Sequence, residues 1–398
     1  MANDAASKQI RTQRAIVVGA GIAGLATALR LHQAGWEVLV IERAPARRSS
    51  GYMVNLIGRG YDAVERLGLL PELAARDIGM FTSILVKADG RQKFVVPAAL
   101  AQAAVGARAL TVFRGDLESA LYEAVHELVP IRFGTTVQAV IQEDNKVQVT
   151  LSDGTSESAE LLVGADGLHS GIRRVVFGPE ADFRVDMRHM VGAFPLDRVP
   201  REVAEGAGTT YIGPGRTAAV INLGAERSSA FFTYRTADPA AELTQGPAQA
   251  LTAAFGDLGG GVPDALRQLE AAPESAYFDS VSQVQMDSWS HGRVVLLGDA
   301  AWCVTLFAGH GATLALTGAD QLGAALTAHG DDIPAALAHW ETQLRPEVLK
   351  RQALARKGMN QFAPPTKAHV LAGDLMIRAI QLPGIRGLTR RAIQRANQ

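Results

Sequence analysis

The sequence contains one cysteine, Cys303, among its 398 residues. A single cysteine excludes an internal disulfide framework and favours a reducing compartment. Long hydrophobic runs are also missing, since the most apolar early stretch, residues 15–29, is short for a bilayer span and contains a glycine motif. The polar opening MANDAASKQIRTQR lacks the apolar core of a signal peptide. We therefore expect a cytoplasmic protein with no segment inside a membrane.

An excess of charge of one sign is absent as well, because 39 Lys and Arg residues face 40 Asp and Glu residues. This balance argues against nucleic acid as a partner. The exception is local, since residues 367–398 carry six basic residues and one acid, Asp374. We interpret this tail as a helix laid on its own protein with a solvated basic face. Contact with a membrane or an acidic partner is the alternative.

A glycine-rich turn follows the first predicted strand. Residues 15–18 and 37–41 are typical of buried strands and residues 22–33 of a helix, which is a βαβ pattern. The turn between the first strand and the helix consists of Gly19, Ala20, Gly21, Ile22, Ala23 and Gly24. Such a G-x-G-x-x-G turn brings bare backbone and a helix N-terminus to a pyrophosphate.

Glu42 ends the second strand, at the spacing of an acid that binds an adenosine ribose. An acid there suits a free 2′-hydroxyl and repels a 2′-phosphate, which favours FAD or NAD over NADP as the nucleotide held at this turn. A tight βα turn without a ligand is the alternative.

Two further strand ends carry a glycine and an acid. One lies in GADGLHSGIRR, with Gly164, Asp166, Gly167, Ser170 and Arg173, and the other is the Gly298-Asp299 pair after RVVLL. Three such strand ends imply one extended ligand contacted from several loops. For Ser170 and Arg173 the alternative is a helix cap and a solvated helix arginine.

Together and in this order, the three motifs resemble the single-component, class A FAD-dependent aromatic hydroxylases with the p-hydroxybenzoate hydroxylase-like fold. The resemblance covers residues 15–345. It implies that the Asp166 motif serves both FAD and the nicotinamide reductant and that Asp299 hydrogen-bonds the ribityl chain of FAD. It also implies that a loop passes close to the flavin ring and that the following helix points its N-terminus at the ring. The residues of that loop and helix start are Gly309, Gly311, Ala312 and Thr313.

This third motif departs from the usual family pattern. Trp302 replaces His or Tyr, Leu306 replaces Pro, and Thr313 replaces Asn. These differences are more similar to the branch of tetracycline-inactivating and natural-product-tailoring monooxygenases. We interpret Cys303 as a small buried residue, because no second cysteine exists for a redox pair. His310 lies either close to the flavin or in solvent.

Several arginines are candidate FAD contacts. The resemblance places Arg114, at the start of a predicted helix, near the flavin phosphate or ribityl region, although it can instead pair with Asp116 or Glu118. Arg47 and Arg48 match the region where relatives meet FAD or the nicotinamide nucleotide, with exposed loop arginines as the alternative. Arg43, next to Glu42, completes the set. The resemblance also implies NADPH or NADH as the reductant, and the absence of a second dinucleotide motif from the sequence fits transient binding of that nucleotide.

A chain of this length exceeds one small core. We predict an α/β fold in which a Rossmann-like, glutathione-reductase-type FAD-binding domain carries an inserted antiparallel-sheet substrate domain and C-terminal helices. The FAD-binding domain is assigned residues 12–79, 109–181 and 283–345, and the substrate-binding domain residues 80–108 and 182–282. Residues 346–398, broken at FAPPT, form a C-terminal helical segment that we expect to brace both domains.

Candidate substrate contacts lie on the predicted strands of the second domain and in the stretch MVN. They are Met53, Asn55, Arg188, His189, Phe194, Tyr211, Asn222, Phe232 and Tyr234. Strand alternation sends half of such residues away from any pocket. Few of them are charged, which favours an apolar aromatic or polycyclic substrate.

The resemblance implies a cytoplasmic FAD-dependent monooxygenase of secondary metabolism. NADPH or NADH reduces the flavin, O2 adds at C4a, and the distal hydroperoxide oxygen hydroxylates the substrate. A flavin-dependent halogenase is an alternative, although the motif WxWxIP and a catalytic lysine are missing from the sequence. A flavin-dependent reductase and a non-catalytic FAD- or product-binding protein are the others. No metal-ligand cluster is visible in the sequence, and relatives are monomers more often than dimers.

Overall fold

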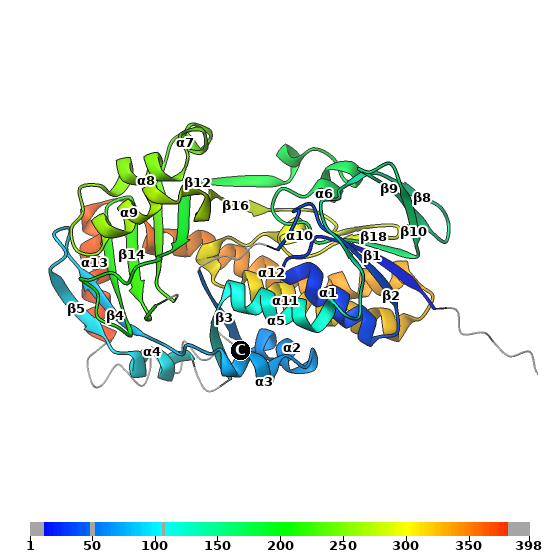
Figure 1. The fold of residues 1–398 in the computed structure, drawn as a ribbon, viewed down its shortest axis with the longest axis horizontal. Coiled ribbons are helices and arrows are strands. Elements are labelled where there is room, and N and C mark those ends of the chain that lie inside the picture. The colour runs from blue at the N-terminus through cyan, green and yellow to red at the C-terminus, as the bar shows by residue number, and fades with distance from the viewer. Residues whose placement is uncertain (1–11, 48–51, 106–107, 226, 381–398) are drawn as a thin grey trace, which may run out of the picture.

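The computed structural model describes residues 12–47, 52–105, 108–225 and 227–380 (Figure 1). One half of the molecule is built on a six-stranded sheet with the order β17-β18-β11-β1-β2-β7. Its strands are β1 (Arg14–Val18), β2 (Glu37–Ile41), β7 (Ile131–Arg132), β11 (Leu161–Gly164), β17 (Ser290–His291) and β18 (Val294–Leu296). β1 runs parallel to β2 and β11, and β11 runs parallel to β18.

This order explains why the glycine motifs act together. The three motifs follow β1, β11 and β18, which are neighbours in the sheet. Because the strands are parallel, their carboxyl ends meet at one edge, where open α/β sheets bind ligands. The continuous apolar strand sequences fit a sheet that is buried on both faces.

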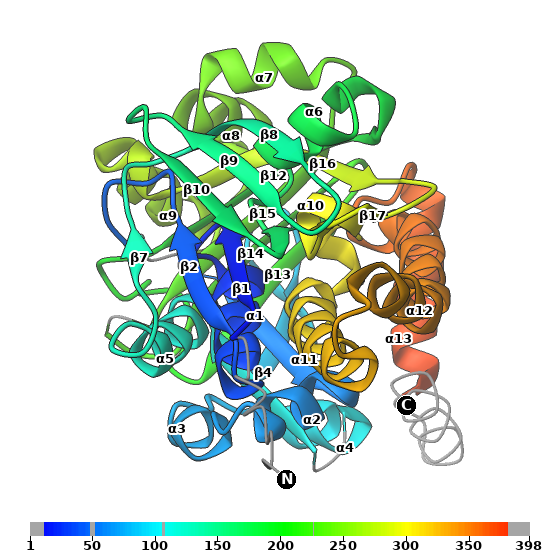
Figure 2. The same cartoon turned by 90° about the vertical axis from the view of Figure 1, so that its right-hand side faces the viewer.

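Helices cover one face of the parallel sheet, and a small sheet covers the other (Figure 2). The helices include α1 (Ile22–Gln33), α2 (Arg59–Arg66), α3 (Leu70–Ala75), α5 (Arg114–Val125) and α11 (Gly311–His329). The small sheet consists of β8 (Val137–Gln142), β9 (Val147–Leu151) and β10 (Ser156–Ala159). Asp320 of α11 pairs with Arg30 of α1 at 3.4 Å and Arg66 of α2 at 2.7 Å, so one buried carboxylate joins three helices.

The other half contains a seven-stranded sheet with the order β16-β12-β15-β14-β13-β4-β5. Its strands are β4 (Thr82–Val86), β5 (Gln92–Val96), β12 (Arg184–Pro195), β13 (Ala207–Gly213), β14 (Arg216–Asn222), β15 (Ser229–Arg235) and β16 (Tyr277–Val284). All neighbouring pairs are antiparallel except β13 and β4. Helices α7 (Pro239–Gln245), α8 (Pro247–Phe255) and α9 (Val262–Ala271) lie over one face of this sheet (Figure 1).

Several short elements complete the two halves. They are β3 (Met53–Ile57), β6 (Ala109–Phe113), α4 (Ala98–Val105), α6 (Gly171–Val176) and α10 (Asp299–Trp302), with 3-10 turns at Glu180–Asp182, Pro273–Ser275 and Leu306–Ala308. β3 and β6 form an antiparallel pair that the sequence patterns did not predict. The predicted α/β fold, with a parallel sheet, an antiparallel sheet and C-terminal helices, is confirmed.

The long helix α12 (Ile333–Phe362) contacts both halves. Trp340 donates its indole N–H to Gly318 O of α11 at 2.9 Å, and the Gln352 amide donates to Val284 O of β16 at 2.7 Å. At its end the Thr217 hydroxyl donates to Phe362 O. The predicted break at FAPPT separates α12 from α13 (Lys367–Ile380), whose Asp374 pairs with Lys93 of β5 at 2.7 Å.

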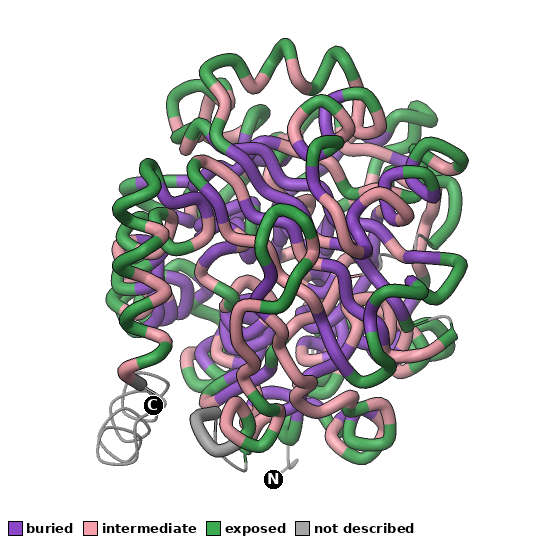
Figure 3. The backbone as a smooth tube through the Cα atoms, turned by 90° about the vertical axis from the view of Figure 1, so that its left-hand side faces the viewer, coloured by how far each residue is buried: buried purple, intermediate pink, exposed green. Residues whose placement is uncertain are grey.

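Burial follows these layers, since the central strands β1, β11 and β18 are mostly buried and residues 367–379 of α13 have no buried position (Figure 3). Most of the predicted basic tail, residues 381–398, lies outside the described residues. Among the helices that the structure describes, none is long and apolar enough to cross a membrane.

Candidate functional site

A cavity of about 400 Å³ lies between the two halves. One wall comes from the parallel-sheet half, with the start of α1, the strand β3 and the loops after β11 and β18. The opposite wall comes from strands β12, β14, β15 and β16 of the seven-stranded sheet. A second hollow of about 200 Å³ adjoins it, and both are lined by Gly21 and Arg114. Together they form one elongated site.

The glycine turn after β1 presents bare backbone to this site. Gly19 has a φ of +107°, and a Cβ there would lie 2.4 Å from Ala165 O. A Cβ on Gly24 would lie 1.8 Å from Gly19 O, whereas one on Gly21 would meet no protein atom within 4 Å. Gly19 and Gly24 therefore pack the turn, and Gly21 faces the cavity.

The start of α1 offers hydrogen-bond donors to the same site. Ile22 and Ala23 line the cavity beside Gly21, and Ala20 lines the adjoining hollow. The N-cap residue of α1 is Gly21, which has no side chain to cap the first turn. Its N–H groups and the positive end of the helix dipole suit an anionic group.

Glu42 shapes the adjoining hollow. Its two carboxylate oxygens accept the N–H groups of Ala20 and Ala44, each at 2.7 Å. A carboxylate has about four lone-pair sites, so it can still accept a ribose hydroxyl. Arg47 also lines the hollow, with its guanidinium 4.4 Å from the centre of the Tyr122 ring. Arg43 is exposed and does not line the hollow, and Arg48 lies outside the described residues.

Arg114 and Asp299 face the site from two different helix starts. Arg114 begins α5 and lies 2.8 Å from Glu118, so the ion pair considered as its alternative role is present in a residue that also lines the cavity. Asp299 begins α10 and lines the cavity. Asp299 is exposed to the cavity, yet desolvation by the protein around it raises its pKa, and the Arg114 charge opposes that shift. A carboxylate in this setting is stabilised by hydroxyl donors on a ligand.

The loop after α10 approaches the cavity with small residues. Gly309, Gly311 and Ala312 line it, and no side chain caps the start of α11. Thr313 is buried instead, and its hydroxyl donates to Asn55 O at 3.2 Å. His310 points neither into the cavity nor freely into solvent. Its ring Nδ1 hydrogen-bonds with Ala308 O, and burial lowers its pKa.

Trp302, Cys303 and Leu306, near the start of this loop, have different surroundings. Trp302 is 1% exposed and packs against Trp289 and Trp340, with ring centres 4.5 and 5.7 Å away. Leu306 lines the cavity. Burial raises the pKa of Cys303 well above its usual value, which keeps it a thiol and unreactive.

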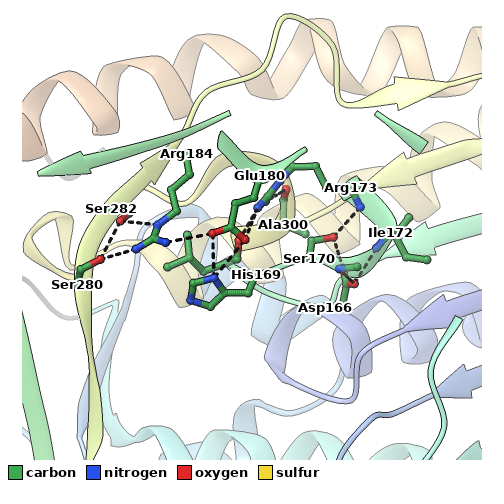
Figure 4. A network of polar contacts seen from close by, with 12 residues as sticks. Asp166, His169, Ser170, Ile172, Arg173, Glu180, Arg184, Ser280, Ser282 and Ala300 are labelled. Carbon is green, nitrogen blue, oxygen red and sulfur yellow. Dashed lines mark hydrogen bonds and ion pairs between the residues drawn. The ribbon is translucent and has the colours of Figure 1, made fainter. Parts of the chain in front are cut away.

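Asp166 differs from its expected role. Its carboxylate accepts the Ser170 hydroxyl at 2.5 Å and the N–H groups of Gly171 and Ile172 at 2.7 and 3.0 Å (Figure 4). Ser170 in turn accepts the N–H of Arg173 at 2.9 Å, so both residues cap α6. Ala165 and Gly167 line the cavity, and Asp166 does not. The motif therefore meets the cavity through backbone and small residues.

The interpretation of Arg173 as a solvated helix arginine is wrong. Its side chain is 0% exposed, and its guanidinium donates to Ala300 O at 2.8 Å and Leu168 O at 2.6 Å (Figure 4). Ala300 follows Asp299 directly. Arg173 thus ties the loop after β11 to the start of α10, which carries the cavity-facing carboxylate.

An ionic network extends from this loop to the seven-stranded sheet (Figure 4). His169 lies 3.1 Å from Glu180 and 3.3 Å from Asp279 of β16. Glu180 pairs with Arg184, which donates to Ser282 at 2.9 Å and to Ser280. The hydrogen bond with Asp279 raises the pKa of His169. The network joins the two walls of the cavity.

Most of the predicted substrate contacts lie on the wrong face of the seven-stranded sheet. Phe194, Phe232, Tyr234 and Tyr211 belong to the core between this sheet and helices α8 and α9. The Phe232 ring centre lies 4.9 Å from that of Phe255 of α8. The Asn222 amide is buried and donates to Val203 O at 2.7 Å.

Arg188 and His189 line a separate hollow with Arg235 and Met359. Met53 and Asn55 of β3 do line the central cavity. Sequence reasoning missed the residues of the opposite strand face, which include the apolar Val191, Ala219, Ile221, Phe231 and Val281 together with Ser229, Ser280 and Ser282. Strand alternation places neighbours such as Phe231 and Phe232 of β15 on opposite faces, but both are apolar, so alternation does not tell which of them faces the cavity.

Comparisons with known proteins agree with this geometry. Residues 12–337 match the family described as FAD binding domain. An FAD-dependent monooxygenase of Sarocladium schorii is 30% identical over 380 residues, which cover 88% of this chain and 88% of that protein. The crystal structure of a tetracycline destructase, Tet(51), has a TM-score of 0.79 at 24% identity and covers 97% of both chains. Klebsiella pneumoniae HpxO, solved with FAD and uric acid, has a TM-score of 0.78 at 24% identity over 96% of both chains.

Proposed function

This chain belongs to the FAD binding domain family and to its class A FAD-dependent monooxygenases, and on that premise we propose that it hydroxylates an apolar aromatic or polycyclic molecule with O2 and NADH or NADPH. The observation that carries the proposal is the elongated site between the halves. One end has an acid and free backbone donors, and the other has an apolar sheet face.

The residues present fit FAD by their chemistry. A Cβ on Gly21 would point into open space, and the uncapped N-terminus of α1 lies beside it, which suits a pyrophosphate. Glu42 suits the adenosine ribose, and Asp299 suits the ribityl hydroxyls. The uncapped start of α11 offers a positive dipole end to the ring system.

When bound, FAD supplies electron transfer from the nicotinamide and the activation of O2. The chain positions the ring system and keeps water away from it. The N-terminus of α11 would stabilise negative charge on the bound ring system. Val191, Ile221 and Phe231 give the opposite wall an apolar surface that excludes water from the reaction space.

Asn55 is proposed to orient the substrate. Its Oδ1 accepts the Thr111 hydroxyl at 2.9 Å, which leaves the amide N–H groups as donors toward the cavity that Asn55 lines. A carbonyl or phenolic oxygen is the complementary group on a substrate. Tetracycline destructase and HpxO, which was solved with uric acid, indicate that related folds take ring compounds. The apolar wall of this chain favours a ring system with few charges.

NADH or NADPH is proposed to bind transiently, because the sequence contains one dinucleotide turn and FAD is proposed to occupy it. We also propose that the protein works as a monomer in the cytoplasm. The buried, protonated thiol of Cys303 is compatible with such a reducing compartment.

The test uses the full-length protein reconstituted with FAD. NADH and NADPH consumption is measured with and without a panel that includes tetracycline, uric acid and simple phenols, under isotopically labelled O2. We expect one compound class to accelerate NADH or NADPH oxidation and to gain one oxygen atom from O2. A protein that holds FAD but oxidises neither nucleotide with any compound would support the non-catalytic alternative, and a halogenated product would support the halogenase.

A further inference from the structure

Thr305 has a buried hydroxyl in the wall of the central cavity. It lies between α10 and the 3-10 turn at Leu306–Ala308, lines the cavity, and is 6% exposed. Its Oγ1 has no hydrogen-bond partner within the described chain. Buried hydroxyls are almost always hydrogen-bonded, because burial removes their bonds to water. A ligand is the partner that this position in a cavity wall suggests.

The backbone at Thr305 gives a second, independent observation. Its φ is +82°, and among the described non-glycine residues only Arg188 also has a positive φ. A β-branched residue is a true outlier in this region, where glycine would be unstrained. Strained residues of this kind cluster at ligand-binding sites. The strained residue Thr305 therefore belongs to the same cavity-lining loop as Gly309.

Thr317 shows that an unpaired buried hydroxyl is not by itself evidence of a ligand contact. This residue is 2% exposed, and its Oγ1 also has no partner among the described residues. However, Thr317 lies inside α11, does not line the cavity, and has no positive φ. Only Thr305 combines the unpaired hydroxyl with the cavity wall and the strained backbone.

The neighbours of Thr305 indicate which part of a ligand it meets. Val304 and Leu306 are apolar and also line the cavity, as does Val281 from β16. Asp299 and Gly309 line it from the two ends of the same loop. In this largely apolar stretch, the hydroxyl is suited to a heteroatom of a planar ring and less to a charged phosphate.

We propose that the Thr305 hydroxyl hydrogen-bonds a ring nitrogen or carbonyl oxygen of the bound flavin and thereby sets the flavin's binding strength and electronic properties. The inference rests on the proposed use of FAD in this cavity. It assigns Thr305 a positioning role toward the cofactor and leaves the identity of the substrate aside.

The experiment compares Thr305→Val, which removes the hydroxyl and keeps the branched shape, with Thr305→Ser, which keeps the hydroxyl. Thr317→Val is the matched control, because it removes an unpaired buried hydroxyl outside the cavity. Each full-length variant is titrated with FAD, and the visible spectrum and midpoint potential of the bound flavin are recorded without substrate. Circular dichroism verifies the fold of each variant.

We expect Thr305→Val to weaken FAD binding by about threefold to tenfold, the value of one buried hydrogen bond, and to shift the flavin spectrum or potential. Thr305→Ser and Thr317→Val should match the wild type. A wild-type-like Thr305→Val, or a Thr305→Ser as weak as Thr305→Val, would overturn the inference. An altered KM for substrate with unchanged FAD binding and spectrum would also overturn it, by assigning the hydroxyl to the substrate. Failure of the wild type to take up FAD would instead refute the proposed function.

Discussion

The two walls of the central cavity are built in different ways. The wall from the parallel-sheet half combines bare backbone and helix starts, at Gly21, Gly309 and Gly311, with the side chains of β3. The wall from the seven-stranded sheet consists of side chains such as Val191 and Phe231. A backbone wall is sensitive to any added Cβ, whereas a side-chain wall can change its shape by substitution. The same fold can therefore keep one cofactor while the substrate changes.

The largest loss of stability is expected for a substitution on the helix-covered face of the seven-stranded sheet, which does not line the cavity. Phe232→Ala removes a ring that is 0% exposed and packed against α8, so it should lower the free energy of unfolding by about 3–5 kcal/mol. Its neighbour Phe231 lines the cavity, and Phe231→Ala should cost about 1 kcal/mol while changing the KM for substrate. Urea denaturation and steady-state kinetics measure both. Equal losses of stability would contradict the assignment of faces.

On the backbone wall, Gly24→Ala and Gly21→Ala form a matched pair. A Cβ on Gly24 would lie 1.8 Å from Gly19 O, so this variant should lose about 3 kcal/mol of stability and its FAD binding. A Cβ on Gly21 would meet no protein atom within 4 Å, so the apoprotein should melt like the wild type. FAD should nevertheless bind about tenfold more weakly, a loss of about 1.4 kcal/mol. Unchanged FAD affinity in Gly21→Ala would contradict binding of the pyrophosphate at this turn.

Substitution to Asn should separate the roles of the two acids, Asp166 after β11 and Asp299 after β18. Asp299→Asn should weaken FAD binding by about tenfold without destabilising the apoprotein at neutral pH. Because the pKa of Asp299 is raised, its ionised form costs stability as the pH rises through that pKa, and Asn removes this cost. Asp166→Asn should lower apoprotein stability by about 1–2 kcal/mol, since its carboxylate caps α6. Thermal melts and FAD titrations at neutral pH would refute this contrast if the two variants behaved alike.

The smallest effect is expected at His169, which joins the walls through Glu180 and Asp279. Its folded-state pKa is raised by the hydrogen bond with Asp279. The resulting stabilisation is fully present below the unfolded pKa of about 6.5 and is lost as the pH rises through the folded pKa. His169→Gln should therefore lower the Tm at about pH 5.5 and leave it unchanged at about pH 9, with a smaller difference at high salt. A difference that grows with pH would contradict the charge assignment.

The backbone wall was the part of the site that sequence could predict. Gly19 and Gly298 follow buried strands, and Gly164 ends one. A glycine at the end of an apolar run can be recognised directly in the sequence. The βαβ pattern then places these strand ends at one edge of a parallel sheet, as the structure has them. The same patterns predicted the α/β fold and the break between α12 and α13.

The side-chain wall could not be predicted because both faces of the seven-stranded sheet are covered. Phe231 and Phe232 are equally apolar, and neither alternation nor charge tells which one faces the helices. Arg173 was misjudged because its partner Ala300 O lies 127 residues away in the chain. The pairing of Asn55 with Thr111 across β3 and β6 was hidden for the same reason.

A crystal structure of the FAD complex tests the central claim most directly. The account predicts the adenosine ribose at Glu42, the pyrophosphate at Gly21, and the flavin ring between the Thr305–Leu306 loop and the strand face that carries Phe231. Density for the ring on the helix-covered face at Phe232, or an adenosine away from Glu42, would contradict it.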